Sequence, residues 1–430
     1  MEHSGVCVGQ NGKDDCFSSF NVKPIKIRNI GENEEEEESE PLSPIARMFH
    51  EPGSNVYIIF SLGFKDPLDS PTLKKNLLDT VLKHPRFTSL QIADEKNSKE
   101  LKWVQTEIDL DNHIIVPKVG NMEPKAADQY VEDYISNLTK TNLSMSIPMW
   151  DAHLLNVKTS DGAVSHLVFR VHHSLGDGTS FISLLLSCSR KLSDPNSLPT
   201  FPAPKKKPIS TSLWSRLFGA FIRFWTVLLV YWNTLVDVLF VVATTYFLKD
   251  TQTPLKAPSA DVAFTSRRIV RCVLPLAEVK FIKNATNTTV NDVLVAVTEA
   301  ALSRYLNRKY NEMMKKKSKA EWGNKIGYVI FPFTIGLKEN PLDHIREVKV
   351  RMDRKKASLE AKFRFFIATV FLRFYRTKSL TINIVSYADT ITMVLAADET
   401  IIPDTHQLCE DLQESLKLLK KSVLAEGLNN

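Results

Sequence analysis

Residues 172–178 read His-His-Ser-Leu-Gly-Asp-Gly and contain the residue types that a proton-abstracting site needs. A hydroxyl becomes a good nucleophile only when a base of near-neutral pKa takes its proton, and histidine is the usual base. That base must be held in one tautomer and one orientation. Asp177, four residues after His173, can do this directly, or it can fix the turn by pairing with a distant arginine. The heptad therefore predicts general-base chemistry on a bound alcohol.

The elements around the heptad must place one imidazole at the mouth of an interior. Residues 165–171 are an apolar stretch that predicts a buried strand, and a helix is predicted to follow. Neighbouring side chains of an extended chain point to opposite faces, so only one of His172 and His173 can face a given cavity. Gly176 and Gly178 are expected to permit a tight bend and a positive φ.

Other kinds of site fit these residues less well. A zinc site needs a third or fourth ligand at short spacing. His153 and His166 lie upstream on the same run, but they do not complete such a pattern, so no metal is expected. A serine hydrolase would carry G-x-S-x-G, which does not occur. A purely structural role for the His-His pair stays open, because most such dipeptides are structural or fortuitous.

The spacing His172-His173-x-x-x-Asp177-Gly178 resembles the HHxxxDG signature of acyl-CoA-dependent acyltransferases of the chloramphenicol acetyltransferase-like superfamily. Five further segments between residues 41 and 423 resemble the plant-type wax ester synthase/diacylglycerol acyltransferase family. They are Pro41-Leu42-Ser43-Pro44, Lys83-His84-Pro85-Arg86-Phe87, Pro148-Met149-Trp150, Val290-Asn291-Asp292-Val293 and Pro403-Asp404-Thr405-His406-Gln407-Leu408. HHxxxDG alone is moderately specific, whereas all six segments in this order are a strong signal.

This resemblance implies a fold, a reaction and its substrates. The fold is α/β, with two chloramphenicol acetyltransferase-like half-domains of mixed sheets, joined by a crossover that carries a long apolar helix. His173 would be the general base that deprotonates a long-chain alcohol, giving a wax ester, or diacylglycerol, giving triacylglycerol. The alkoxide would attack the thioester of a fatty acyl-CoA. Acyl-CoA is a substrate in this scheme, and no cofactor is expected.

The resemblance also implies roles for the neighbouring residues. Asp177 would be structural or orienting, His172 supporting and Gly178 part of the turn. Asn291 and Asp292 would bind substrate near a channel between the half-domains. The residues themselves offer a simpler interpretation of this last pair, as the polar N-terminus of the helix that follows, where unpaired N–H groups need acceptors.

One part of the family pattern is missing from the second half of the chain. No Ser-Asn-x-x-Gly-Pro occurs anywhere. We therefore expect a segment of some tens of residues to be absent near residues 363–379. The alternative function that follows is a catalytically inactive, truncated family member that only binds lipid or membrane.

Composition divides the chain into four expected parts. Residues 1–40 contain ten acidic and four basic residues and predict an acidic disordered tail. Residues 41–200 are the expected N-terminal half-domain with HHxxxDG, residues 201–260 a Pro/Lys linker with a membrane-associated helix, and residues 261–430 the C-terminal half-domain. The five cysteines are widely spaced and suit a reducing compartment rather than a disulfide framework.

The candidate membrane element covers residues 217–248. A helix of this length is about 48 Å long, enough to cross a hydrocarbon core of about 30 Å. A single lipid-surrounded span would leave Asp237 in hydrocarbon. An interfacial or protein-docked helix is therefore favoured over a span, and both over a fully buried helix. At 100° per residue, six polar residues of this helix fall in one sector about 100° wide: Arg223, Thr226, Asn233, Thr234, Asp237 and Thr244.

The expected partners follow from these features. They are fatty acyl-CoA, a long-chain alcohol or diacylglycerol, and membrane lipid, at the endoplasmic reticulum membrane with the catalytic domain on the cytosolic side, or at the plasma membrane. Basic clusters at residues 205–207, 315–317 and 346–356 suit a solvated surface, anionic headgroups or the phosphates of CoA. Aromatic residues do not interleave with these clusters, so nucleic acid is not expected. The sequence does not specify an oligomeric state.

Apolar periodicity predicts the remaining elements. Strands are predicted at residues 56–60, 167–171, 269–274, 328–331, 380–385 and 390–395. Helices are predicted at residues 72–83, 126–138, 179–192, 292–307 and 406–419, with Leu408, Leu412, Leu416 and Leu419 on a core-facing side of the last one.

Overall fold

The structure is a computed structural model. It describes residues 40–51, 55–93, 101–190, 213–246, 266–314, 338–359 and 379–427, with 324–326, 331–333 and positions 194, 197, 199 and 336. The predicted acidic tail up to residue 39, most of the Pro/Lys linker and the site of the expected deletion lie outside the described residues.

The first part of the chain forms a four-stranded sheet in the order β1-β6-β5-β4. β6 (Ser165–His172) lies between β1 (Tyr57–Phe64) and β5 (Trp150–Leu155), antiparallel to both, whereas β4 (Ile114–Ile115) runs parallel to β5. The sheet is therefore mixed, as expected. Every residue of β6 is buried, as expected for a strand covered on both faces, and its run Leu167–Phe169 with Val171 made it recognisable.

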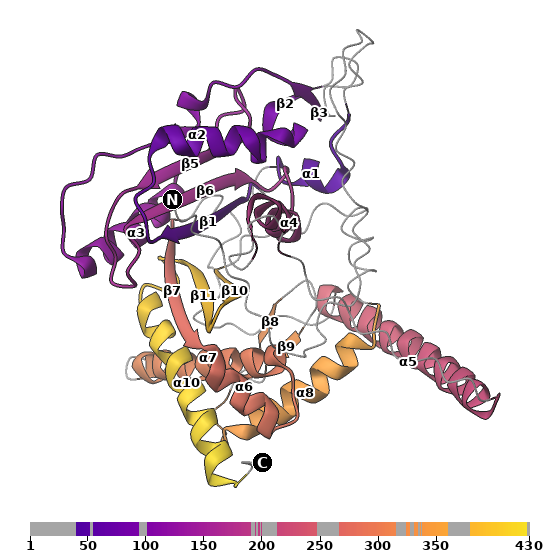
Figure 1. The fold of residues 1–430 in the computed structure, drawn as a ribbon. Coiled ribbons are helices and arrows are strands. Elements are labelled where there is room, and N and C mark those ends of the chain that lie inside the picture. Colours follow the sequence, from indigo (N-terminus) through magenta and orange to yellow (C-terminus); the bar gives the residue numbers. More distant parts are fainter. Residues whose placement is uncertain are drawn as a thin grey trace.

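Helices cover both faces of this sheet (Figure 1). α1 (Pro44–Met48), α2 (Ser70–Asp79) and α4 (Gly178–Cys188) contribute to one core with Trp150 and Phe169. α3 (Pro124–Leu138) packs on the other face against Leu155 and Val168. The smaller elements of this part are the hairpin β2 (Ser89–Ala93) and β3 (Leu101–Gln105) and the short helices η1 (Val81–Lys83), η2 (Pro85–Thr88) and η3 (Leu110–Asn112).

The second part of the chain forms a three-stranded antiparallel sheet in the order β10-β11-β7. Its strands are β7 (Arg267–Pro275), β10 (Leu380–Tyr387) and β11 (Thr390–Asp398), and a short pair, β8 (Asn324–Ile326) and β9 (Phe331–Phe333), lies apart from it. Its helices are α6 (Leu276–Ala285), α7 (Val290–Met314), α8 (Leu342–Lys356) and α10 (Thr405–Ala425). The four leucines of α10 are buried in the core of this part, as predicted.

The two parts meet along a polar seam where α3 packs beside β7 (Figure 1). Arg268 of β7 pairs with Glu132 at 2.7 Å and with Asp133. His406, at the start of α10, lies 2.9 Å from the same Glu132 carboxylate. The backbone N–H of Ile269 donates to the Ser136 hydroxyl at 3.0 Å. Charges and hydrogen bonds therefore connect the sheet that carries the heptad to the second sheet.

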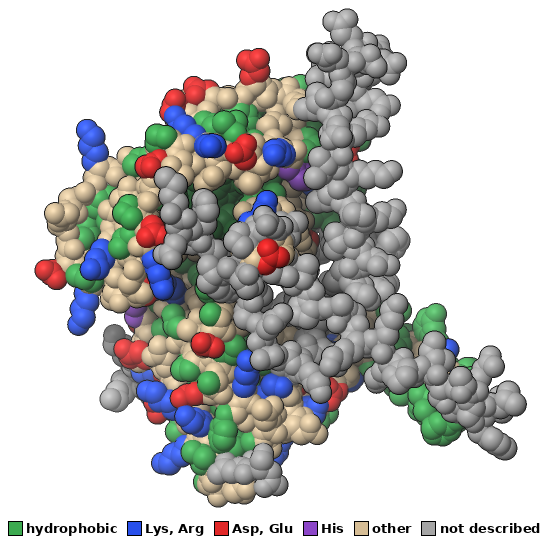
Figure 2. Space-filling model, viewed as in Figure 1, with side chains coloured by type: hydrophobic (Ala, Val, Ile, Leu, Met, Phe, Trp, Pro, Cys, Tyr) green, Lys and Arg blue, Asp and Glu red, His purple; other side chains and the backbone are tan. Residues whose placement is uncertain are grey.

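A long apolar helix, α5 (Leu213–Tyr246), projects from the second part of the molecule (Figure 1). It begins four residues before the predicted start, and its predicted last residues, 247 and 248, lie outside the described ones. It is long and apolar enough to cross a membrane, with Phe218–Leu239 as the candidate span, of which only 6% is buried. Figure 2 shows its hydrophobic side chains exposed at the lower right.

Candidate active site

His173 follows the last residue of β6 and keeps part of its side chain accessible. Its backbone N–H donates to the carbonyl of Val56 at 2.9 Å. Its imidazole stacks on Phe49, with ring centroids 4.1 Å apart and an interplanar angle of 19°. Burial lowers the pKa of His173 below its ordinary value of 6.5, although the charge of Asp177 acts in the opposite direction. The ring is therefore oriented, neutral at physiological pH and able to accept a proton.

His172 lies in a different environment, as strand alternation predicted. Its side chain is 1% exposed. Nε2–H donates to the carbonyl of Phe49 at 3.2 Å, and Nδ1 lies 2.6 Å from the Ser174 hydroxyl. Burial, with the nearby His50, lowers the pKa of His172 to about 3. Both ring nitrogens of His172 are therefore occupied by protein groups, and its supporting role stays a prediction.

Asp177 caps α4. One carboxylate oxygen, Oδ1, accepts from the backbone N–H of Ser180, from the Ser180 hydroxyl and from the Thr179 hydroxyl, each at 2.8 Å. Burial raises the pKa of Asp177, but these hydrogen bonds outweigh it and hold the pKa below the ordinary value. Within the described part of the chain, its hydrogen bonds go to the helix rather than to His173 or an arginine. The capping contacts agree with a structural role.

The expectation that glycines give this turn a positive φ is wrong. Among the described glycines, only Gly162 and Gly427 have positive φ. Gly176 instead lies at a close approach, since an added Cβ would lie 3.2 Å from the Cβ of Ser180 and would push that residue outward. Gly178 is the first residue of α4, and no described atom lies within 4 Å of where its Cβ would be.

Segments distant in the sequence hold the heptad from several sides. The guanidinium of Arg86, in η2, donates to the carbonyl of Leu175 at 3.1 Å. The carbonyl of Met149 accepts from the backbone N–H of His172 at 3.0 Å. Phe49 follows α1, which begins after the N-capping hydroxyl of Ser43. Two of the five segments that carried the family resemblance therefore contact this turn, and a third begins the helix that leads to Phe49.

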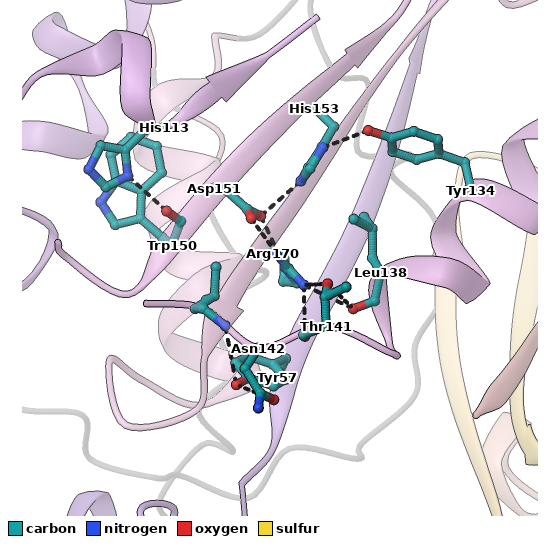
Figure 3. Close-up of polar contacts among 11 residues, drawn as sticks. Tyr57, His113, Tyr134, Leu138, Thr141, Asn142, Trp150, Asp151, His153 and Arg170 are labelled. Carbon is teal, nitrogen blue, oxygen red and sulfur yellow. Dashed lines mark hydrogen bonds and ion pairs between the residues drawn. The ribbon is translucent and has the colours of Figure 1, made fainter. Parts of the chain in front are cut away.

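Arg170, three residues before His173, anchors the strand through a buried polar network (Figure 3). Its guanidinium makes a two-point contact with Asp151 on β5. It also donates to the carbonyl of Leu138, the last residue of α3, at 2.9 Å and to that of Thr141, in the loop that follows, at 3.0 Å. Asp151 lies 3.0 Å from His153 Nε2, whose Nδ1 is 2.8 Å from the Tyr134 hydroxyl. Asp151, His153 and Arg170 are each at most 7% exposed.

The histidines considered as metal ligands have separate partners. His153 belongs to the network above, and His166 Nε2 lies 3.0 Å from the Thr159 hydroxyl. Within the described ranges, no group of three or more His, Cys, Asp or Glu is placed to hold a metal ion.

Asn291 and Asp292 lie in the first turn of α7, in the second part of the molecule. Asp292 is fully buried. Its carboxylate accepts from the backbone N–H of Thr289 at 2.9 Å, and its own N–H donates to the Thr289 hydroxyl at 3.3 Å. This reciprocal pair is a capping box, so the simpler helix-terminus interpretation accounts for Asp292. Asn291 is exposed, and substrate binding by this pair stays a prediction.

Sequence reasoning missed Phe49, the residue that stacks on His173 and accepts from His172. It follows a helix of only five residues, too short for a periodic signal. The available signal was Ser43-Pro44, an N-cap followed by proline at the first helical position. This pair marks the start of a helix shortly before Phe49.

Two substitutions of Asp177 distinguish its role as a helix cap from the effect of its negative charge on His173. We expect Asp177→Ala to lower the free energy of unfolding by about 1 kcal/mol, because the capping hydrogen bonds are lost. The melting temperature and the activity should fall with it. Asp177→Asn keeps an N-capping oxygen and should retain most of the stability. Without the negative charge, the pKa of His173 falls further, so the acid limb of the pH–rate profile should move to lower pH. Equal losses of activity in both variants, with unchanged melting, would contradict the capping role.

Comparison with known proteins covers about nine-tenths of the chain. The model of the wax ester synthase/diacylglycerol acyltransferase catalytic domain matches residues 64–294, and that of the corresponding C-terminal domain matches 322–379 and 374–420. The chain is 36% identical to wax ester synthase/diacylglycerol acyltransferase 11 of Arabidopsis thaliana, over 91% of this chain and 96% of that protein. It is also 36% identical to wax ester synthase/diacylglycerol acyltransferase 5 of Arabidopsis thaliana, over 90% of this chain and 94% of that protein.

Solved structures show the same fold. The wax ester synthase/diacylglycerol acyltransferase from Marinobacter aquaeolei VT8 matches with a TM-score of 0.55 at 16% identity, over 89% of this chain and 99% of that chain. The first condensation domain of the CDA synthetase matches with a TM-score of 0.53 at 13% identity, over 88% and 93%. These matches confirm the predicted fold class.

Proposed function

Because this chain belongs to the wax ester synthase/diacylglycerol acyltransferase family, we propose that it transfers a fatty acyl group from acyl-CoA to a hydroxyl. The acceptor is a long-chain alcohol, diacylglycerol or both. The observation that carries the proposal is a histidine, oriented by Phe49 and partly accessible, at the HHxxxDG position of a chain that aligns with its relatives over about nine-tenths of its length.

His173 is the general base in this proposal. It takes the proton of the acceptor hydroxyl while the oxygen attacks the thioester carbonyl of acyl-CoA. The C–S bond breaks as the tetrahedral intermediate collapses, giving the ester and CoA thiolate, and His173 returns its proton to the thiolate sulfur. A neutral imidazole is required at the start, and the lowered pKa of His173 supports this. No cofactor takes part.

Exposed apolar surface after the turn supports an apolar substrate. α4 begins at Gly178, directly after the capping residue Asp177. Ile182, one turn into this helix, is 47% exposed. A soluble protein normally places polar residues on such a face. A fatty acyl chain or the alkyl chain of the acceptor is the kind of ligand that would cover it.

The C-terminal half-domain of this chain is proposed to be shorter than in its relatives. The C-terminal family model matches in two pieces that meet at residues 374–379. The alignment with the first Arabidopsis protein runs over 475 positions, more than the 430 residues of this chain. β10, which follows the expected deletion, pairs only with β11 in the described part, and its Val385 is 54% exposed. A missing neighbouring strand would account for that open edge.

The proposed location is the cytosolic side of the endoplasmic reticulum membrane. An exposed apolar helix supports membrane association, and the acceptors dissolve in the bilayer. The described cysteines Cys188, Cys272 and Cys409 are free thiols, as suits a reducing compartment. The partners are then acyl-CoA, the acceptor lipid and membrane lipid.

Product formation tests the function. Microsomes containing the full chain are incubated with labelled palmitoyl-CoA and either a C16–C18 alcohol or diacylglycerol, beside microsomes without it. We expect labelled wax ester, triacylglycerol or both. Absence of both products, from protein shown to be folded, would favour the lipid-binding alternative.

A second chain, with a Ser-Asn-x-x-Gly-Pro segment of a relative inserted between Phe366 and Leu380, tests the deletion. We expect it to express better and to form more product, because unpaired backbone groups and lost core cost several kcal/mol against a net stability of ~5–15 kcal/mol. Equal yield and equal activity of the two chains would mean that the segment is dispensable.

A further inference from the structure

α5 has two parts with different surroundings. Residues 218–229 are exposed on nearly every side. Aromatic side chains are prominent there and just beyond: Trp225 is 56%, Tyr231 65% and Trp232 63% exposed. Trp and Tyr favour the level of lipid headgroups. After Trp232, one side of the helix is instead in contact with the protein, whereas Leu235 and Leu239 stay at least half exposed.

The second part of α5 is fixed to the C-terminal end of α8. Asp237 is fully buried, and its carboxylate lies 2.6 Å from the Lys355 ammonium and 3.1 Å from the Arg354 guanidinium. The Asn233 amide donates to the carbonyl of Ala357 at 3.0 Å. The Thr234 hydroxyl accepts from the N–H of Leu359 at 2.9 Å. Three residues of the predicted polar stripe therefore form one joint, called the α5–α8 joint below.

The joint limits how far α5 can reach into a membrane. Of the candidate span Phe218–Leu239, only residues 218–232 lie before the joint. They extend about 22 Å, less than the ~30 Å of a hydrocarbon core. Starting instead at residue 213 gives about 30 Å, but this places Arg223 near the bilayer centre, where an arginine is costly.

We propose that α5 is a one-leaflet arm. The α5–α8 joint holds its second part on the protein, and residues 218–232 lie at a shallow angle in a single phospholipid leaflet. An upright arm would exceed the ~15 Å of hydrocarbon in one leaflet and would carry Arg223 toward the bilayer centre. Tyr231 and Trp232, directly before the joint, then lie at headgroup level where the arm leaves the body. The inference rests on the membrane association proposed above and is independent of acyl transfer.

A one-leaflet arm widens the surfaces on which the protein can work. Wax esters and triacylglycerol are apolar and separate from water as oil covered by a phospholipid monolayer. A spanning helix has no place on such a surface, since its far end would have to be in oil. An arm that enters one leaflet fits the monolayer as well as a bilayer, so the protein can remain at the surface of its accumulated product.

Flotation with two lipid probes tests the arm without substrate. The full-length protein is mixed with phosphatidylcholine vesicles, or with triolein droplets coated by a phosphatidylcholine monolayer. We expect both to bind it, and alkaline carbonate to release it from the vesicles. Trp225→Ser with Trp232→Ser should weaken binding to both probes by about tenfold or more. The control Leu78→Ser, which changes a residue 56% exposed on α2, should leave binding unchanged.

Limited proteolysis tests the joint. Trypsin cuts after Arg354 and Lys355, whose side chains the joint occupies. We expect Asp237→Ala to speed cleavage there several-fold while lipid binding is retained. The matched control is Asp353→Ala, which removes an exposed carboxylate that pairs with Lys349 outside the joint.

Three results would overturn the inference. One is vesicle-bound protein that resists carbonate and does not bind droplets, as a span would. The second is unchanged binding after both tryptophan substitutions. The third is equal cleavage of wild type and Asp237→Ala. None of these three results depends on acyltransferase activity. A failure of the proposed function can therefore be told apart from a failure of the one-leaflet arm.

Discussion

Replacing His173 by alanine is expected to lower acyl transfer by roughly 10²- to 10⁴-fold or more, because the acceptor hydroxyl then has no base. His173 is a surface-accessible ring stacked on Phe49, so its loss should leave the fold intact. The initial rate with palmitoyl-CoA and a C16–C18 alcohol, per folded protein, measures the effect. The rate of the wild type should fall on the acid side only below pH 6.5, since the pKa of His173 is lowered from that value.

His172→Ala is the matched control for this substitution. It removes a ring that is 1% exposed and bonded to Phe49 and Ser174, so we expect a lower melting temperature but a milder loss of activity per folded molecule. A His173→Ala protein as active as the wild type would refute the mechanism. A larger loss of activity from His172→Ala, at unchanged melting, would move the base to the other ring.

Replacing Arg170 by leucine is expected to destabilise the protein by about 3–5 kcal/mol, because Asp151 would be left as an uncompensated buried charge. The change also releases the carbonyls of Leu138 and Thr141 that the guanidinium binds (Figure 3). The thermal or urea midpoint measures the loss, together with the soluble yield.

The double variant Arg170→Leu with Asp151→Leu is the control for this prediction. Removing both charges avoids the unpaired carboxylate, so the double variant should be more stable than Arg170→Leu alone. If the single change shifts the midpoint by less than the double change, the network does not act as an ion pair, and packing of the arginine stem explains its burial.

The sequence predicted the parts of the site whose signals are local. β6 was recognisable from its apolar residues Leu167, Val168, Phe169 and Val171, and the turn because its residue types are unusual together. The capping of α4 by Asp177 was not predicted, because the sequence offered this carboxylate only as a partner of His173 or of a distant arginine. The stripe of α5 was visible because the helical period places Asn233, Thr234 and Asp237 on one side, and these residues form the α5–α8 joint.

What the sequence did not predict depends on contacts between distant residues. β5 was missed because Asp151 and His153 interrupt its apolar pattern, and only Arg170 and Tyr134, from other elements, make their burial acceptable. α8 was missed because charged residues dominate it, and its buried face is only Leu342, His344, Ile345 and Val348. Phe49 meets His173 across more than a hundred residues, which no local pattern can indicate.

The α5–α8 joint also sets an order of events during synthesis. Asp237 and Lys355 are 118 residues apart, which a ribosome translates in roughly 6–24 s at about 5–20 residues per second. The first sheet, built from residues 57–172, can close before α5 emerges. For those seconds α5 has no α8 to dock on, and an apolar helix beside a newly folded body is available to chaperones or to a nearby lipid surface. The first contact of the nascent chain with lipid is therefore expected to precede completion of the joint, and a fusion that delays the last residues should prolong that window.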